Sequence, residues 1–215
     1  MRRRLAASSR IIRLGCAAYF GLLVFALSGA FAQRATAPEI VPRAGWGAQP
    51  ADKGLMQAQR PREIVIHHTA EAQRPEQTLA QKLQLLQRFS RALGKVQGRA
   101  KPAWGDVPYH FYVDAVGRIA EGRDLNYAGD TNTPYSTAGR IQIVLEGHFD
   151  KEQPSAAQLR SLDRLVIWLA AKHAIPAAKI SGHNDHVPTS DCPGRALKAY
   201  LPTLRAKVAG AALAR

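Results

Sequence analysis

The chain has 215 residues, of which 46% are hydrophobic, and a formal net charge of +14. This length leaves room for one well-buried domain, or two small ones at most, and we expect one. The excess of positive charge favours anionic surroundings, although a basic surface that only aids solubility would have the same composition. Basic residues interleaved with aromatic ones do not form a stripe in the sequence. The composition therefore argues against a nucleic-acid-binding protein.

The first 32 residues have the layout of a secretory signal peptide. They contain five arginines, no acidic residue and an apolar run that ends at the small residues Ala30 and Ala32. We expect cleavage after Ala32, which lowers the formal charge from +14 to +9 and exports the protein to the periplasm or out of the cell. The alternative is an uncleaved membrane anchor, because residues 14–31 approach the apolar length that begins to span a bilayer.

A linker and a buried strand follow. Residues 33–39 are polar and contain proline, which is typical of a linker. Trp46 lies between two glycines, and we expect it to pack onto the domain as an aromatic plug. The apolar run at residues 64–66 predicts a strand buried on both faces, and therefore a sheet covered by helices. His67 ends this strand, and His68 should point to the opposite face because strand side chains alternate.

The next segment predicts a helix, a loop and a strand pair. A leucine stripe within residues 76–93 predicts an amphipathic helix whose basic, glutamine-rich face is solvated. Residues 94–106 contain several turn formers and are predicted to form a long loop. Two strands joined by a turn are expected within residues 109–124, with Tyr109 on the same face as Phe111.

The rest of the chain mixes loops, a strand and helices. A turn-rich loop is expected at residues 126–136, and the alternating pattern of residues 140–146 predicts a strand. Ser155 and Gln158 have the spacing of a capping box, which predicts the start of a helix that ends before Pro176.

A last leucine stripe within residues 197–208 predicts a C-terminal helix. Strands mixed with helices, without an internal repeat, predict one α/β or α+β domain over residues 40–215. We expect a central mixed β-sheet flanked by helices.

The loop GHNDHVPTSDCPG, residues 182–194, carries the residues best suited to chemistry. Loss of the signal peptide would leave Cys192 as the only cysteine, and an unpaired thiol in an oxidising compartment is a liability unless a metal occupies it. Cys192 and His183 are both good zinc ligands, and His67 is the obvious third. If each residue is considered alone, the alternative is that Cys192 is a small buried hydrophobic residue and that His183 is a hydrogen-bonded loop residue.

The motifs together resemble the zinc-dependent N-acetylmuramoyl-L-alanine amidases of the amidase type 2 group, whose relatives include phage amidase-type lysozymes and peptidoglycan recognition proteins. The matching pieces are PRAGWGAQP, VIHHTA, WGDVPYHFYVDAVGRIAEGRD and GHNDHVPTSDCPG, in the order of the family. The resemblance implies the fold of that family, one zinc ion, and hydrolysis of the amide bond between N-acetylmuramic acid and L-alanine. The implied partners are peptidoglycan or muropeptides, not nucleic acid, with a membrane contacted only through an uncleaved N-terminal segment.

Carried over by motif, the resemblance implies zinc ligands at His67, His183 and Cys192. The family's catalytic tyrosine falls on Tyr109, although Pro108 stands where the family has glycine. These residues define the expected catalytic centre.

The remaining catalytic assignments stay open. A hydroxyl that supports the transition state falls on Thr189 by residue type and on Ser190 by counting back from the cysteine. Some family members instead use a glutamate on the strand that corresponds to residues 140–146. The matching position here is Val144, which leaves Glu146 as a weak candidate.

Two other functions are compatible with these motifs. Relatives that recognise peptidoglycan without cutting it share the fold, but they typically lack the cysteine ligand, which this chain keeps at Cys192. A zinc peptidase that cleaves within the stem peptide is the third possibility. The chemical ends produced from wall material distinguish the three.

Overall fold

The computed structural model describes residues 36–96 and 98–214. The predicted signal peptide, residues 1–32, and the first residues of the predicted linker lie outside these ranges. Within them, every helix is too short or too polar to cross a bilayer.

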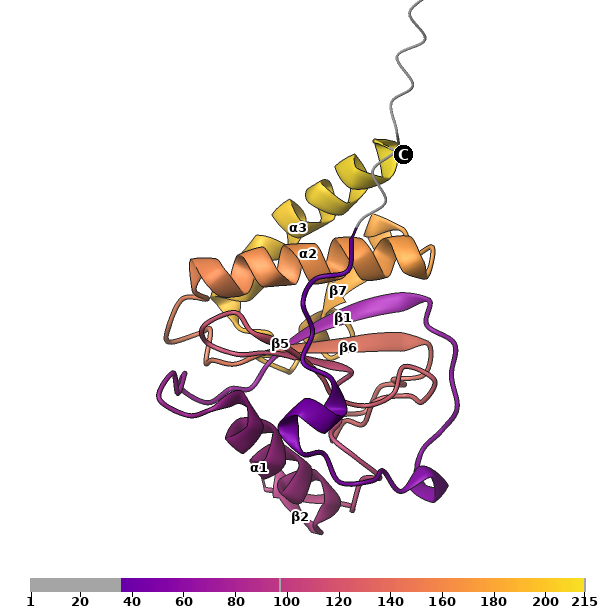
Figure 1. Ribbon diagram of the computed structural model, residues 1–215, viewed down its shortest axis with the longest axis vertical. Helices are drawn as coiled ribbons and strands as arrows, with labels where there is room; N and C mark the ends of the chain where they lie inside the picture. Colours follow the sequence, from indigo (N-terminus) through magenta and orange to yellow (C-terminus); the bar gives the residue numbers. More distant parts are fainter. Residues whose placement is uncertain (1–35, 97, 215) are drawn as a thin grey trace, which may run out of the picture. The chain divides into compact units, whose positions relative to one another are not determined.

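A five-stranded mixed sheet forms the centre of the domain, with the strand order β5-β4-β6-β1-β7 (Figure 1). The strands are β1 (Glu63–His68), β4 (Phe111–Val113), β5 (Ile119–Glu121), β6 (Arg140–Leu145) and β7 (Ile180–Gly182). β1 pairs in parallel with β6 and β7, β4 pairs in parallel with β6, and only β5 is antiparallel. The expected mixed sheet and its β4–β5 strand pair are confirmed.

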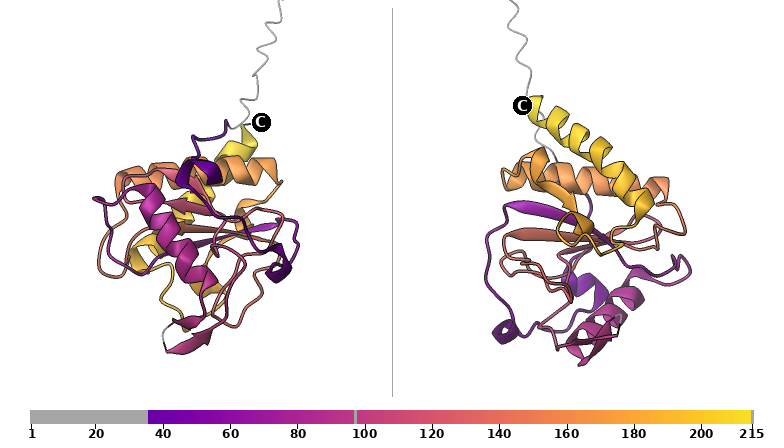
Figure 2. Two further views of the ribbon diagram at one scale, coloured as in Figure 1. Left: turned by 60° about the horizontal axis from the view of Figure 1, so that its bottom comes forward. Right: turned by 180° about the vertical axis from the view of Figure 1, so that it is seen from behind.

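Two helices, α2 (Ala156–Lys172) and α3 (Arg195–Leu213), cover one face of this sheet (Figure 2). α2 begins at the predicted capping box, in which Ser155 Oγ accepts from the Gln158 N–H and Gln158 Oε1 accepts from the Ser155 N–H. The core beneath them includes Ile64, Ile66, Phe111, Val113, Ile141, Ile143 and Leu145 from the strands and Leu162, Leu165, Leu169, Leu197, Leu201 and Leu204 from the helices. Alternate residues of β1 and β6 therefore face α2 and α3, as the sequence predicts.

The other face of the sheet packs against α1 (Leu79–Arg91) and the short 3-10 helix η1 (Arg43–Trp46). Trp46 is 1% exposed, and its Nε1 donates to the carbonyl of Glu121 at 2.7 Å, so it packs as the expected plug. The core on this side consists of Trp46, Leu79, Leu83, Tyr112, Ala120 and Val144.

The basic face of α1 is not wholly solvated, so that prediction is wrong for Lys82. Lys82 is buried, and its Nζ lies 2.8 Å from Glu146 Oε2. The carboxylate of Glu146 also accepts from the N–H groups of Arg74 and Ala115, at 2.7 and 2.8 Å. These contacts offset the cost of burying both charges.

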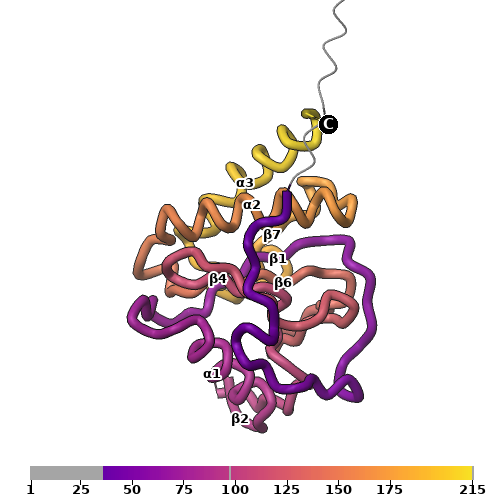
Figure 3. The backbone as a smooth tube through the Cα atoms, in the orientation of Figure 1, coloured from indigo at the N-terminus to yellow at the C-terminus, as the bar shows by residue number. Residues whose placement is uncertain are grey.

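Residues 94–106 also differ from the predicted loop, because they contain a hairpin of β2 (Gly94–Val96) and β3 (Arg99–Lys101) beside α1 (Figure 3). Buried Lys101 fixes the hairpin to the end of the helix, since its Nζ donates to the carbonyls of Ser90, Ala92 and Pro102 at 2.7 to 2.8 Å. The strands have three residues each, too few for an alternating pattern to predict them.

Candidate metal centre

His67 and His68 occupy the last two positions of β1 and point to opposite faces of the sheet, as expected from strand alternation. The His67 ring lies 5.3 Å from the ring of Tyr109, on the α1 face. On the other face, His68 Nδ1 accepts from the N–H of Phe149 at 3.2 Å, and Phe149 belongs to the core beneath α2 and α3.

The three predicted metal ligands come together at the carboxyl end of β1. His183 opens the 3-10 helix η4 (His183–Asp185) directly after β7, whose Gly182 pairs with Ile66. Cys192 lies in the loop before α3, and its carbonyl accepts from the N–H of Asn184 at 2.8 Å. One ligand atom from each of His67, His183 and Cys192 lies within 4.8 Å of the others.

Neighbouring side chains fix the orientation of both histidine rings. His67 Nε2 lies 2.5 Å from Gln142 Oε1, and His67 Nδ1 lies 3.5 Å from Cys192 Sγ. His183 Nε2 lies 2.8 Å from the hydroxyl of Thr133. Each ring therefore contacts a neighbour through Nε2. The Gln142 oxygen is an acceptor only, so it sets the tautomer of His67 and leaves Nδ1 beside Cys192, as a neighbouring acceptor does for a histidine that binds a metal.

Tyr135 closes one side of the cluster. Its ring lies 5.1 Å from that of His183 and stacks on His186 at 5.4 Å, while its hydroxyl donates to Gln142 Oε1 at 3.2 Å. Sequence reasoning missed Tyr135, Thr133 and Gln142. Only Gln142 left a signal, because it is a polar side chain within the buried strand β6.

The electrostatics of the cluster fit a cation with nitrogen and sulfur ligands. Burial, followed by the charge of His183, lowers the pKa of His67 to about 3, and burial, followed by the charge of His186, lowers that of His183 to about 4. Both imidazoles are thus neutral at pH 7, the form that binds metals. Burial raises the pKa of the Cys192 thiol to about 12, so a cation would be needed to ionise it. Two neutral imidazoles and one thiol are a donor set that suits zinc.

Tyr109 lies beside the cluster, but the expected shared face with Phe111 is wrong. Phe111 faces α2 and α3, whereas Tyr109 packs against the core on the α1 side. β4 begins only at Phe111, so strict alternation does not extend back to residue 109. Burial, followed by the charge of Cys192, raises the pKa of Tyr109, so its phenol remains a hydrogen-bond donor at neutral pH.

The two candidate hydroxyls have different surroundings. Ser190 Oγ accepts from the N–H of Cys192 at 3.2 Å, so Ser190 is tied to the backbone of a candidate ligand. The side chain of Thr189 is exposed. Asp185 stabilises the same loop, because it accepts from the N–H of Gly182 at 2.8 Å and pairs with Lys198.

The strand candidates do not join the cluster. Val144 is fully buried in the core on the α1 side. The carboxylate of Glu146 pairs with Lys82 and accepts from two backbone N–H groups, so these contacts account for its burial without a catalytic role.

A second group of potential ligands, His68, His148 and Asp150, is also within 4.8 Å. His68 Nδ1 uses its lone pair to accept from the Phe149 N–H, so the proton of the neutral ring must lie on Nε2. Neither nitrogen of His68 is then free to bind a metal, and this group is a poor cation site.

A mixed sheet with two histidines and a cysteine at the carboxyl end of its central strands defines a single α/β domain of the peptidoglycan-recognition-protein type. The crystal structure of Drosophila PGRP-SD matches it with a TM-score of 0.64 and 27% identity, covering 77% of this chain and 94% of that chain. The amidase LysCS of Clostridium intestinale matches with a TM-score of 0.55 and 26% identity, covering 75% and 90%.

The Amidase_2 family model, described as N-acetylmuramoyl-L-alanine amidase, matches residues 57–195, and the chain belongs to this family. Peptidoglycan-recognition protein SD of Drosophila melanogaster is 29% identical over 187 residues, which cover 85% of this chain and 94% of that protein. The N-acetylmuramoyl-L-alanine amidase of Sus scrofa is 31% identical over 169 residues, which cover 77% of this chain but 27% of that protein.

Proposed function

We propose that this protein hydrolyses the amide bond between N-acetylmuramic acid and L-alanine in peptidoglycan, with one zinc ion held by His67, His183 and Cys192. The observation that carries the proposal is the convergence of two imidazoles and a thiol within 4.8 Å. It is supported by membership of a family described as N-acetylmuramoyl-L-alanine amidases.

The reaction adds one water across the amide bond and leaves a lactyl carboxylate and the free amine of L-alanine. When bound, zinc supplies a Lewis acid and lowers the pKa of a water from about 15.7 towards about 7, which makes a nucleophile at neutral pH. Gln142 and Thr133 each contact Nε2 of one imidazole and so orient the two rings, and Nδ1 of His67 lies beside Cys192.

Tyr109 and the loop hydroxyls have the chemistry to stabilise the transition state. The neutral phenol of Tyr109, next to the His67 ring, donates a hydrogen bond to the oxyanion that develops on the carbonyl. A hydroxyl of Thr189 or Ser190 donates to the same charge. The chain needs no covalent intermediate for this hydrolysis.

The proposed substrates are peptidoglycan or muropeptides, met after export. One relative, the ectodomain complex of PGRP-LCa and PGRP-LCx, was solved with tracheal cytotoxin bound, and its match here has a TM-score of 0.63 and 26% identity. The proposed export rests on the signal-like layout of residues 1–32. An N-terminus at Gln33 in protein recovered from the periplasm or the medium would support it.

Recognition of peptidoglycan without cleavage is the second candidate function. The observation that favours it is the 29% identity to peptidoglycan-recognition protein SD over 85% of this chain. Retention of Cys192 beside both histidines favours hydrolysis, because a binding module has no need of a complete ligand set.

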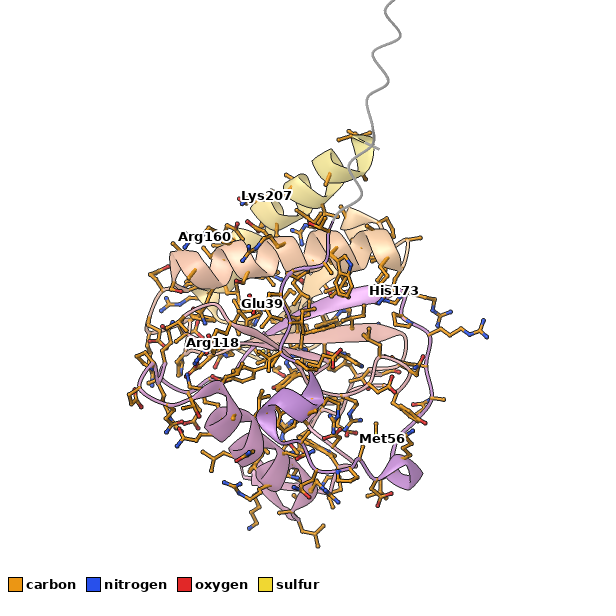
Figure 4. The ribbon with its side chains drawn as sticks, in the orientation of Figure 1. Glu39, Met56, Arg118, Arg160, His173 and Lys207 are labelled. Carbon is orange, nitrogen blue, oxygen red and sulfur yellow. The ribbon has the colours of Figure 1, made fainter. Side chains whose placement is uncertain are left out.

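Digestion of purified sacculi by the zinc-containing protein tests the proposal. We expect new lactyl carboxylates and new alanine amino termini in equal amounts. Peptide ends within the stem would instead indicate a peptidase, and binding without new ends would indicate a recognition protein. Cys192→Ala should abolish the products, whereas His173→Gln, a histidine replacement at the end of α2 outside the cluster, should not (Figure 4).

A further inference from the structure

An apolar stripe lies exposed on the outer side of α1 and continues past its end. Leu85, Phe89 and Leu93 are 45%, 47% and 80% exposed. Leu85 and Phe89 are four residues apart and so lie on one face of the helix, and Leu93 follows its C-cap Ala92. Large apolar side chains gathered in this way on a surface indicate a contact with something apolar.

Positive charge accompanies this stripe on α1 and on the hairpin that follows it. Arg88, Arg91, Lys95 and Arg99 are all exposed, and the sequence from residue 77 to residue 105 contains no aspartate or glutamate. Among the described residues, none of these four cations takes part in an ion pair. We call the three apolar residues and the four cations the α1 patch.

The α1 patch is held rigidly. Lys101 fastens the hairpin that carries Lys95 and Arg99 to the carbonyls of Ser90 and Ala92 at the end of α1. The N–H of Trp104 also donates to the carbonyl of Ser90, at 3.0 Å. The helix and the hairpin therefore present their side chains as one surface, which lies across the sheet from α2 and α3 (Figure 1).

We propose that the α1 patch docks on an anionic phospholipid surface. An apolar stripe flanked by arginine and lysine is the pattern of helices that lie in the membrane interface, with apolar side chains below the headgroups and cations at the phosphates. The long arginine and lysine side chains can reach the headgroups while their stems cover the apolar stripe.

Two other occupants fit the α1 patch less well. A second copy of this chain would bring the same four cations towards one another, and like charges at an interface oppose association. An anionic glycan would satisfy the cations, but it offers no apolar layer for Leu85, Phe89 and Leu93. Of these three, a lipid surface alone provides both.

A tryptophan at the patch tests the proposal in the full chain. Leu93→Trp should lose fluorescence on vesicles of brominated phosphatidylglycerol and phosphatidylcholine, because its side chain enters the quencher layer. Signal from the three native tryptophans is subtracted with the parent protein. Val116→Trp, at a site 51% exposed and outside the patch, is the matched control and should not be quenched. This readout reports on the patch itself, whatever the N-terminal segment contributes to binding.

Charge variants in the Leu93→Trp background complete the test. Changing Arg88, Arg91, Lys95 and Arg99 to glutamine should raise the lipid concentration needed for half-maximal quenching at least tenfold. Each cation near a charged membrane surface contributes to the binding free energy. The control changes four other exposed cations to glutamine, Lys151, Arg160, Arg164 and Lys172, of which Arg160 is labelled on α2 in Figure 4. It alters the net charge equally and should leave the quenching unchanged.

Several results would overturn the assignment. Absence of quenching on anionic vesicles rules out lipid docking, and equal quenching on neutral vesicles rules out an anionic surface. Equal losses in both charge variants would show an effect of net charge alone. Concentration-dependent dimers in sedimentation that disappear on Leu85→Gln and Phe89→Gln, without quenching, would assign the patch to a second copy.

Discussion

His67 Nε2 lies 2.5 Å from Gln142 Oε1, on the neighbouring strand β6, and this contact fixes which nitrogen of His67 can bind a metal. The Gln142 oxygen is an acceptor, so Nε2 carries the proton and Nδ1 keeps its lone pair beside Cys192. The backbone of Gln142 is fixed in turn, because its N–H donates to His110 Nδ1 at 2.8 Å. The ring of a candidate ligand is thus oriented from the interior of the sheet.

We therefore expect Gln142→Leu to weaken zinc binding by about 10- to 100-fold, because residues that orient a ligand from behind typically contribute that much to affinity. Competition with a chromophoric chelator measures the affinity. Gln142→Glu is the matched control, since it keeps an acceptor oxygen for His67 Nε2 and should stay near the parent value. Equal affinities in Gln142→Leu and the parent would mean that the contact does not support the ligand.

Cys192→Ala should lose zinc, because the variant keeps only two protein ligands and lacks the thiolate, a strong zinc donor. Metal analysis after dialysis against a weak chelator decides the point. His148→Ala, which alters the neighbouring group on the other face of β1, should retain one zinc per chain. A Cys192→Ala protein with stoichiometric zinc at parental affinity would show that the cysteine is not a ligand.

Tyr109→Phe should keep zinc and the fold but lose activity by about 10²-fold or more, the usual effect of removing one hydrogen bond to an oxyanion. The ring next to His67 is preserved, so packing is not disturbed. Release of alanine amino termini from sacculi and zinc content are measured on the same preparation. Unchanged turnover would leave Tyr109 as a packing residue only.

The sequence predicted the parts of this site that depend on regular periodicity or on ligand type. His67 comes directly after an apolar run, and Cys192 is a residue type with few roles in a chain whose sequence predicts export. Thr133 and Tyr135 were not predictable in this way, because they lie in a loop whose path is set by tertiary contacts with His183 and Gln142.

Long elements were predicted better than short ones for the same reason. The helices α2 and α3 each bury a leucine stripe against the sheet, and this stripe is visible in the sequence. The hairpin at residues 94–101 depends instead on Lys101, whose buried position no local pattern indicates. Lys82 resembles a solvated helix residue until the fold brings Glu146 next to it.

The metal-free protein should lose stability as the pH falls below about 6.5. In the folded protein, mainly because of burial, the pKa of His67 is lowered to about 3 and that of His110 to about 4. Between these values and 6.5 the unfolded chain binds more protons, so stability is complete above about 6.5 and declines as the pH approaches the folded values. Each of these two histidines contributes roughly 1.4 kcal/mol per pH unit in that window.

Urea unfolding of chelator-treated protein at pH 7.5, 6.5, 5.5 and 4.5 measures this dependence. The urea midpoint should differ only slightly between pH 7.5 and pH 6.5. It should then fall steeply at pH 5.5 and pH 4.5. His110→Asn removes one of the buried imidazoles and should flatten the decline relative to its own value at pH 7.5. A midpoint independent of pH down to 4.5 would contradict the assignment of neutral, buried histidines.

Thr189 and Ser190 should give different results when their hydroxyls are removed. Ser190 Oγ accepts from the N–H of Cys192, so Ser190→Ala should loosen the ligand loop and lower zinc affinity together with activity. Thr189 is exposed and free to turn towards substrate, so Thr189→Val should lower turnover while zinc content stays at one per chain. A hydroxyl that donates to the oxyanion contributes about 3 kcal/mol in other enzymes, which corresponds to a loss of more than 10²-fold. Activity on sacculi and chelator competition are measured for both variants. Near-parental turnover in both would mean that Tyr109 and the metal stabilise the oxyanion without help from this loop, and a turnover defect confined to Ser190→Ala at full zinc occupancy would assign the catalytic hydroxyl to Ser190.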